Sequence, residues 1–229
     1  MLKTKKLVLF GDSAFAEIAY EYFTHDSEYE VVAFTVSEEF LSKNELFGLP
    51  IIPFEDIENQ FPASKYALHI ALVYNSLNRI RRKFYLEAKE KGYHLANYVS
   101  SKAFVWSNVE LGDNVFIFED NTIQPFVKIG SNNVFWSGNH IGHHSEIGSH
   151  NFFSSHVVIS GFCKIGSSNF FGVNSTVNNN LEIGDDCIIG SSSLVVKNMS
   201  SGLLLKGQPA IVDNLTTWEK SNINPINEI

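Results

Sequence analysis

An apolar residue returns at every sixth position through the second half of the chain. The unbroken run is Val99, Val105, Leu111, Ile117, Ile123, Ile129, Phe135, Ile141, Ile147, Phe153, Ile159, Ile165, Phe171, Val177, Ile183, Ile189 and Val195. A helix would scatter positions with this spacing around its circumference, and an amphipathic strand would require alternation at every second residue. The period therefore predicts a chain that turns after each hexapeptide.

A pair formed by an aliphatic residue and a glycine returns at three times that spacing. The pairs are Leu111-Gly112, Ile129-Gly130, Ile147-Gly148, Ile165-Gly166 and Ile183-Gly184. Three hexapeptides thus make one coil, which predicts a triangular parallel β-helix with strands stacked about 4.8 Å apart. Compact residues four places after the anchors suit its narrow interior: Ala103, Val115, Ser145, Asn151, Val157, Cys163, Asn169, Ser175, Cys187 and Ser193.

The same register places asparagines and cysteines inside the coils. Asn133, Asn151 and Asn169 fall in one column, where we expect a ladder of stacked amides. Cys163 and Cys187 take inward positions on different faces. Both are expected to be free, buried thiols, which suits a reducing compartment.

The N-terminal part follows a different pattern, in which apolar strands alternate with helices. Strands are expected at residues 6–10, 31–36 and 69–74, and helices at residues 17–23 and 77–92. This βαβ-like order predicts a small parallel sheet. The change of pattern divides the chain into an N-terminal domain (1–96), the β-helix (97–200) and an extended C-terminal tail (201–229), in which residues 213–229 form either a disordered segment or a short helix.

The first turn, Gly11-Asp12-Ser13-Ala14-Phe15-Ala16, joins a strand to a helix. The backbone N–H groups of a helix N-terminus bind phosphate, although a turn of this kind also occurs with no ligand. Only Gly11 of the G-x-G-x-x-G pattern is present, and no acidic residue closes the second strand. A redox dinucleotide is therefore not expected.

Charge and composition exclude several classes of protein. The 229 residues carry a net charge of -8, and no basic stripe is present to neutralise nucleic-acid phosphates. No apolar run approaches the length of a membrane span, and the N-terminus lacks the layout of a signal peptide. We therefore expect a cytoplasmic protein that binds neither nucleic acid nor membrane.

The chain resembles the bacterial sugar acyltransferases of the sialic-acid O-acetyltransferase and bacillosamine N-acetyltransferase type. The resemblance lies in the turn at residues 11–16, the hexapeptide repeat, the coil Gly138-Asn139-His140-Ile141-Gly142-His143-His144-Ser145 and the ending Gly207-Gln208-Pro209-Ala210. It implies an α/β half-Rossmann domain followed by a left-handed parallel β-helix. It also implies a homotrimer, with acetyl-CoA in the cleft between adjacent β-helices and a nucleotide-linked sugar against the N-terminal domain.

The resemblance also implies roles for individual residues. His143, five residues before Gly148, matches the catalytic histidine and would act as general base on a sugar amine; His144 stands beside it, where the family often has an acidic residue. The residues implied for acetyl-CoA are Phe152, Val173, Asn174, Gly190, Ser191 and Gly207. Those implied for the sugar nucleotide are Gly11, Asp12, Ser13, Phe15, Thr35, His140 and His156. Phe15 either stacks on the ligand or packs in the core.

Three alternatives remain at this point. The first is O-acetylation of a sialic-acid-like or other sugar hydroxyl, and the second is a trimeric scaffold or sugar-binding protein without catalysis. The third is a zinc lyase of the carbonic anhydrase type, suggested by the histidines between residues 140 and 156. However, His144, His150 and His156 fall on three successive faces, so that only a threefold interface could gather them. We therefore expect no metal, and we expect outward aromatic residues on the β-helix to contact another subunit.

Overall fold

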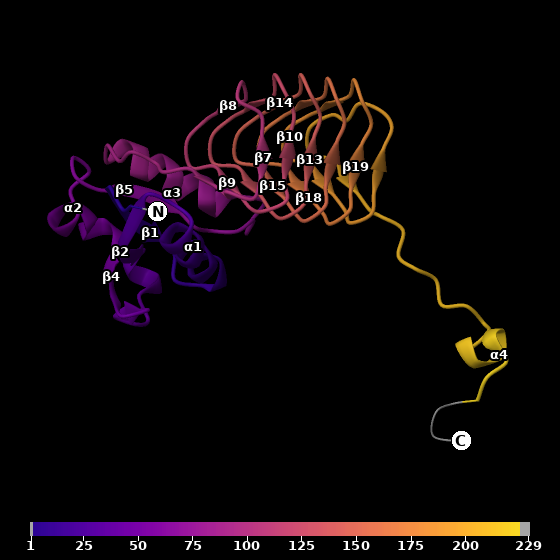
Figure 1. Cartoon of the computed structure of the whole chain (residues 1–229), viewed down its shortest axis with the longest axis horizontal. Helices are drawn as coiled ribbons and strands as arrows, with labels where there is room; N and C mark the ends of the chain where they lie inside the picture. The colour runs from indigo at the N-terminus through magenta and orange to yellow at the C-terminus, as the bar shows by residue number, and fades with distance from the viewer. Residues whose placement is uncertain (1, 225–229) are drawn as a thin grey trace.

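The computed structural model describes residues 2–224, and it consists of an α/β domain packed against the first coils of a β-helix (Figure 1). The strands of the first domain are β1 (Lys5–Phe10), β2 (Tyr29–Val36), β3 (Glu45–Leu46), β4 (Leu49–Pro53) and β5 (Ala67–Ile70). Its helices are α1 (Ala14–His25), α2 (Ile57–Gln60) and α3 (Arg79–Glu90), with 3-10 turns at Glu38–Phe40 and Phe54–Asp56. The sheet order is β3-β4-β2-β1-β5, and only β3 pairs antiparallel.

The predicted parallel sheet is confirmed, with two differences. The third predicted strand ends at Ile70, four residues earlier than expected. The strand β4 was not predicted, because Pro50 and Pro53 within it are signals against a central strand. Pro50 lies outside the three residue pairs that join β4 to β2, and Pro53 takes the last of them, at the end of the strand.

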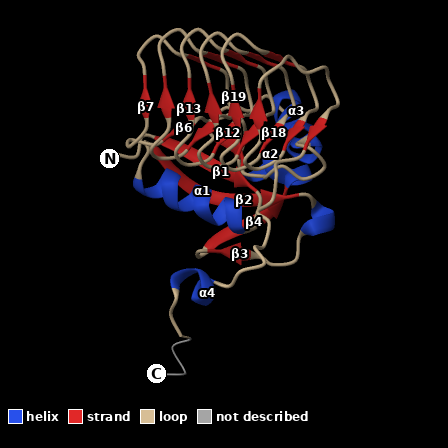
Figure 2. Ribbon diagram, turned by 90° about the vertical axis from the view of Figure 1, so that its right-hand side faces the viewer, coloured by secondary structure: helices blue, strands red, loops and turns tan. Residues whose placement is uncertain are grey.

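The β-helix has three faces, as the hexapeptide period predicts (Figures 1 and 2). The β6–β23 face contains β6 (Tyr98–Val99), β9 (Phe116–Ile117), β12 (Val134–Phe135), β15 (Phe152–Phe153), β18 (Phe170–Phe171), β21 (Ile188–Ile189) and β23 (Leu204–Leu205). The β7–β22 face contains β7 (Phe104–Val105), β10 (Thr122–Ile123), β13 (His140–Ile141), β16 (Val158–Ile159), β19 (Thr176–Val177) and β22 (Leu194–Val195). The β8–β20 face contains β8 (Glu110–Leu111), β11 (Lys128–Ile129), β14 (Glu146–Ile147), β17 (Lys164–Ile165) and β20 (Glu182–Ile183).

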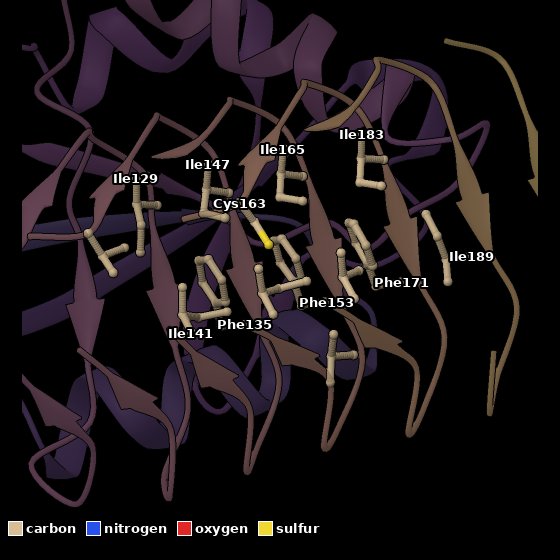
Figure 3. Close-up of a cluster of buried hydrophobic side chains, with 14 of the residues drawn as sticks. Ile129, Phe135, Ile141, Ile147, Phe153, Cys163, Ile165, Phe171, Ile183 and Ile189 are labelled. Atoms are coloured by element: carbon tan, nitrogen blue, oxygen red, sulfur yellow. The ribbon is translucent and has the colours of Figure 1, made fainter. Parts of the chain in front are cut away.

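The second residue of each β-helix strand points inward and stacks on its equivalent in the next coil (Figure 3). The rings of Phe135, Phe153 and Phe171 stack nearly parallel, with centroids 4.5 and 4.6 Å apart. Cys163 and Cys187 are free and buried, as predicted. Each fully buried side chain of this size contributes about 1.5–3 kcal/mol, so the repeat itself provides the core.

The predicted column of Asn133, Asn151 and Asn169 is present, but the amides do not bond to one another. Each side-chain oxygen accepts from the backbone N–H one coil further on, for example from Asn151 to Asn133 at 2.7 Å and from Asn169 to Asn151 at 2.8 Å. The amide nitrogens of Asn133 and Asn151 donate to backbone carbonyls of glycines. These asparagines therefore satisfy the backbone at a corner of the coil, where strand pairing is interrupted.

The N-terminal domain covers the β6–β23 face from β6 to β18. Phe116, Phe118 and Phe152 are buried against it, together with the partly buried Phe170. The expectation that outward aromatic residues contact another subunit was therefore wrong for these four, since the chain covers them itself. Phe162 differs, because 53% of its surface is exposed.

A buried arginine also joins the two domains. Arg81 of α3 is fully buried, and its guanidinium donates to the backbone carbonyls of His150 and Asn151 at 3.3 and 2.9 Å. Burial lowers its pKa to about 9. His150 lies beside it and accepts from the Asn132 amide at its Nδ1, 2.8 Å away. Burial, helped by the nearby arginines, lowers the pKa of His150 to about 4, so this histidine is a neutral part of the domain interface.

The chain leaves the β-helix after β23 and extends away from it (Figure 1). A short helix, α4 (Thr217–Ser221), begins with a capping box formed by Thr216 and Glu219. A terminal helix was one of the two expectations for this segment; residues 225–229 lie outside the described residues. Between residues 2 and 224 no helix combines the length and apolar character needed to cross a membrane.

Candidate active site

His143 and His144 lie at a corner of the β-helix between β13 and β14. We call the corners at residues 124–127, 142–145, 160–163 and 178–181, which join the β7–β22 face to the β8–β20 face, the histidine edge. His144 adopts a left-handed backbone conformation with φ of 58°. This conformation turns the chain sharply, so both imidazoles project outward, and both are exposed in the single chain.

Aromatic rings lie on both sides of His144. Phe126 and Phe162 occupy the same corner position one coil before and one coil after it, with φ of 65° and 58°. Their ring centroids lie 4.6 and 4.9 Å from that of His144, in stacked orientation. Left-handed backbone recurs at this corner position throughout the β-helix and so belongs to its turns, although it is unusual for a residue as bulky as phenylalanine. The stack of three rings, and not the backbone, distinguishes the histidine edge.

The His143 imidazole is held by contacts at one side. Its Nδ1 lies 3.1 Å from Nδ1 of His144, and its ring meets the Phe162 ring edge-on, with centroids 5.0 Å apart. Its backbone N–H donates to Oε1 of Gln124 at 3.0 Å. Among the described residues, no hydrogen bond engages Nε2, so this nitrogen remains available to a ligand.

Gly161 provides the space in which the His143 ring lies. A Cβ added at Gly161 would stand 3.0 and 3.1 Å from Cε1 and Nε2 of His143. The backbone N–H of Gly161 forms no hydrogen bond within residues 2–224. The backbone N–H of Gly161 is therefore a free donor at the corner 160–163. This corner lies one coil beyond the corner that carries the free Nε2 of His143.

If His143 has the catalytic role that the resemblance implies, replacing Gly161 with alanine is expected to lower turnover while leaving the fold intact. The added methyl group would push the Nε2 edge of His143 out of position, and a small misplacement of a reacting group costs up to about a hundredfold in rate. Turnover and melting temperature should be measured together, with Ser160→Ala as the control because it adds no atom in the same corner. Full activity of the Gly161 variant would show that the ring does not react from this position.

The residues implied for acetyl-CoA mostly lie on a different edge. We call the corners at residues 154–157, 172–175 and 190–193, which join the β6–β23 face to the β7–β22 face, the far edge. It carries Val173, Asn174, Gly190 and Ser191. Gly207 packs directly on the carbonyl of Ser191, and a side chain there would collide with it. The width of the β7–β22 face thus separates these residues from His143 within one chain.

Phe152 lies under the N-terminal domain rather than on the far edge itself. Its side chain is only 4% exposed, and its ring meets that of Tyr74 with centroids 4.9 Å apart. Phe152, Tyr74, Trp136 and Val173 line a small cavity of about 230 Å³ that opens beside the far edge. The role of Phe152 as a CoA contact stays a prediction.

The turn at residues 11–16 requires glycine at its first position. Gly11 has φ of 124°, and a Cβ there would meet the carbonyl oxygen of Ala71 at 2.9 Å, so glycine is required. Ser13 caps α1 without using its hydroxyl. Asp12 is paired with Lys43, whose Nζ lies 3.7 Å from the carboxylate and donates to the backbone carbonyl of Asp12 at 2.9 Å.

Two other residues implied for the sugar nucleotide are used by the fold. Phe15 is buried and packs against Phe116 and Trp136, with centroids 5.4 and 5.7 Å away, which is the packing alternative. Thr35 is buried and donates from its hydroxyl to the carbonyl of Ile52 at 2.9 Å. Neither side chain is free to reach a ligand in this arrangement.

The other histidines of the β-helix lie apart from this pair and from one another. His140 faces outward from β13, on the β7–β22 face. His156 lies on the far edge, where its imidazole covers Gly138. Within the described part of the chain, no three His, Cys, Asp or Glu side chains gather where they could hold a metal ion.

Solved structures with this architecture include enzymes that acetylate sugars. One is PerB from Caulobacter crescentus, in complex with CoA and GDP-perosamine, with a TM-score of 0.78, 22% identity and coverage of 93% of this chain and 100% of that one. Another is the acetyltransferase domain of PglB from Neisseria gonorrhoeae, with a TM-score of 0.80, 18% identity and coverage of 91% and 99%. The fold is shared with sugar acetyltransferases.

A variant of the Caulobacter perosamine N-acetyltransferase, with one histidine replaced by asparagine and with CoA and GDP-perosamine bound, matches with a TM-score of 0.64, 21% identity and coverage of 93% and 99%. No family model and no curated protein sequence matches the chain. At these identities the comparisons establish the half-Rossmann domain and the β-helix, and they leave the chemistry to be argued from the residues.

Proposed function

We propose that the protein transfers an acetyl group from acetyl-CoA to the amine of a nucleotide-linked amino-deoxy sugar, for use in surface glycans. The observation that carries the proposal is the His143 imidazole, whose Nδ1 is engaged by His144 while its Nε2 stands free beside Gly161. A histidine held in this way is suited to act as general base near neutral pH. The similar structures that hold CoA together with an amino sugar nucleotide support the choice of substrates.

The proton transfer and the oxyanion contact of the proposed reaction use residues of the histidine edge. Nε2 of His143 removes a proton from the sugar amine as the amine nitrogen forms a bond to the thioester carbonyl carbon. The carbonyl oxygen becomes negative, and we assign the free backbone N–H of Gly161 as its hydrogen-bond donor. When the intermediate collapses, the C–S bond breaks and the CoA thiolate takes the proton from Nε2, so the imidazole is neutral again.

A homotrimer would bring the acetyl-CoA residues to His143. The N-terminal domain covers most of the β6–β23 face, from β6 to β18, and the β8–β20 face presents a charge ladder in which Glu110, Lys128, Glu146, Lys164 and Glu182 alternate in register. Such a ladder favours contact with water.

The β7–β22 face is the one that suits a subunit contact. Its outward residues are Phe104, Thr122, His140, Val158, Thr176 and Leu194, of which none is Asp, Glu, Lys or Arg. Phe104 and Leu194 are well exposed, and an uncharged, partly apolar face of this kind marks a contact surface. Copies packed along it would set the far edge of one chain beside the histidine edge of the next, and would place His140 and His156 at that contact.

A thiol-release assay with acetyl-CoA tests the proposed reaction. Nucleotide-linked amino sugars should be offered beside the matching hydroxy sugars, and turnover is expected with an amino sugar only. Turnover with hydroxy sugars alone would make the protein an O-acetyltransferase. If protein that still binds CoA releases no thiol with any sugar of the panel, the proposed acceptor class is contradicted. The cytoplasmic location inferred from the sequence stays a prediction.

A further inference from the structure

The imidazoles of His143 and His144 meet through their Nδ1 atoms. Their Nδ1 atoms are 3.1 Å apart, and their ring planes lie at 88°. With the ring planes perpendicular, the line that joins the two Nδ1 atoms can lie in both planes. The N–H bond of one ring can therefore point at the lone pair of the other. One nitrogen must carry the proton and the other must accept it, because two protonated nitrogens would repel.

We propose that His144 is a positioning residue whose neutral imidazole accepts a hydrogen bond from Nδ1–H of His143 and so fixes His143 in the tautomer with a free, basic Nε2. The proposal rests on the proposed function for its catalytic meaning, although the hydrogen bond itself does not require any substrate. In this arrangement His144 carries its own proton on Nε2. It orients the imidazole of His143 as a carboxylate would orient a catalytic imidazole.

The direction of the hydrogen bond follows from which nitrogen is free. If His144 donated to His143, the proton of neutral His143 would lie on Nε2, and the atom beside Gly161 would not be a base. With His143 as donor, Nε2 holds a lone pair at the position where a Cβ of Gly161 would come within 3.1 Å. When Nε2 takes up the amine proton, Nδ1–H becomes a stronger donor to His144, and the positive charge is shared over that contact.

The aromatic stack explains how an exposed ring stays in place. Phe126 and Phe162 lie on the two faces of His144 at 4.6 and 4.9 Å and restrict its rotation. The backbone N–H of His144 donates to the carbonyl of Pro125 at 3.2 Å, which ties the corner to the coil before it. The ring is thereby aimed at His143 before any ligand binds.

The surroundings contain few groups that would compete for the proton. The corners above and below, at residues 124–127 and 160–163, contribute Cys163 as their one titratable side chain, and it points into the core. The flanking strands contribute His140 and Glu146, and the strands that follow the corners above and below contribute Lys128 and Lys164; all four face outward. None of them forms a hydrogen bond or ion pair with the two imidazoles among the described residues. Among these groups, His144 is therefore the one that meets Nδ1 of His143.

Three substitutions at His144 separate its possible roles. His144→Phe keeps the stack and removes the acceptor, and phenylalanine already occupies this corner position at residues 126 and 162. His144→Asn keeps an acceptor oxygen near the place of Nδ1 and tolerates left-handed backbone. His144→Asp supplies a charged acceptor. All three should retain the wild-type melting temperature within a few degrees, since the site is exposed.

We expect His144→Phe to lower kcat by about tenfold to a hundredfold at unchanged KM for acetyl-CoA, as on losing the partner that orients an imidazole. His144→Asn should lose less activity than His144→Phe, because a neutral acceptor remains. Its decrease in log kcat should be less than about a third of the decrease in His144→Phe. His144→Asp should move the acidic limb of the kcat/KM profile upward by about one pH unit or more, since a carboxylate stabilises the imidazolium. Equal losses in Phe and Asn variants, or an unmoved profile in the Asp variant, would overturn the proposal.

Heteronuclear NMR of nitrogen-labelled wild-type protein provides a readout that needs no activity. The proposal predicts that His143 carries its proton on Nδ1 and His144 on Nε2 at neutral pH, and that His143 loses this preference in His144→Phe. The reverse tautomers would overturn it. An inactive protein with the predicted tautomers would instead refute the proposed function and leave the positioning role standing.

Discussion

Replacing His143 with alanine is expected to lower kcat by about a hundredfold or more, the scale for removing a general base. The ring lies at an exposed corner and contacts chiefly His144 and Phe162, so the fold should survive. The measurement is steady-state kinetics with saturating acetyl-CoA, together with circular dichroism and the melting temperature. Because Nε2 is the atom that takes the proton, the loss should appear in kcat more than in KM.

The matched control is His94→Ala, which removes an exposed histidine from the N-terminal domain, far from the histidine edge in sequence. It should leave turnover at the wild-type level. If His143→Ala also kept the wild-type rate, the base would have to be sought at His144 or His156, and the proposed role of His143 would be refuted.

Acid is expected to destabilise the protein through His69, by about 3 kcal/mol between pH 6.5 and pH 4. His69 is fully buried, and desolvation lowers its pKa from 6.5 to about 4, while its Nδ1 donates to the carbonyl of Ala96 at 2.8 Å. Its folded-state pKa is below its unfolded value, so the unfolded chain binds a proton first as the pH falls. The contribution is therefore complete above pH 6.5 and is lost on the way to pH 4.

Denaturant unfolding at pH 7 and at pH 4.5 measures this loss. His69→Asn is the informative variant, since its amide nitrogen can still donate to Ala96 while nothing titrates. Its free energy of unfolding should fall by clearly less than that of the wild type between the two pH values. An equal fall would assign the acid sensitivity to other groups, of which buried His150 is the first candidate.

The β-helix could be predicted from the sequence because its interior repeats strictly. Each anchor from Ile117 to Val195 is buried, and each stacks on an equivalent residue eighteen positions away. The period could not show what covers the outside. Phe116 and Phe152 were expected to meet another subunit, whereas the chain's own N-terminal domain packs on them, since apolar character specifies burial and not the partner.

The candidate site could be predicted in part. The spacing of His143 from Gly148 matched the resemblance, but Phe126, Phe162 and Gly161 were not singled out as site residues. A signal existed, because Phe126, His144 and Phe162 follow one another at eighteen residues in a corner position that elsewhere holds Asn, Asp, Ser or Gly, apart from His150 and His156. For Phe15 and Thr35 the sequence could not reveal that packing and a buried hydrogen bond already use the side chains.

Mass spectrometry of the nucleotide sugar recovered after incubation with acetyl-CoA measures the transferred group and its linkage directly. The expected product is the amino sugar nucleotide carrying one added acetyl group in a bond that resists hydroxylamine, as an amide does. An acetyl group that hydroxylamine removes would place it on a hydroxyl oxygen. An unmodified sugar, from protein shown to bind both substrates, would contradict the acetyltransferase function altogether.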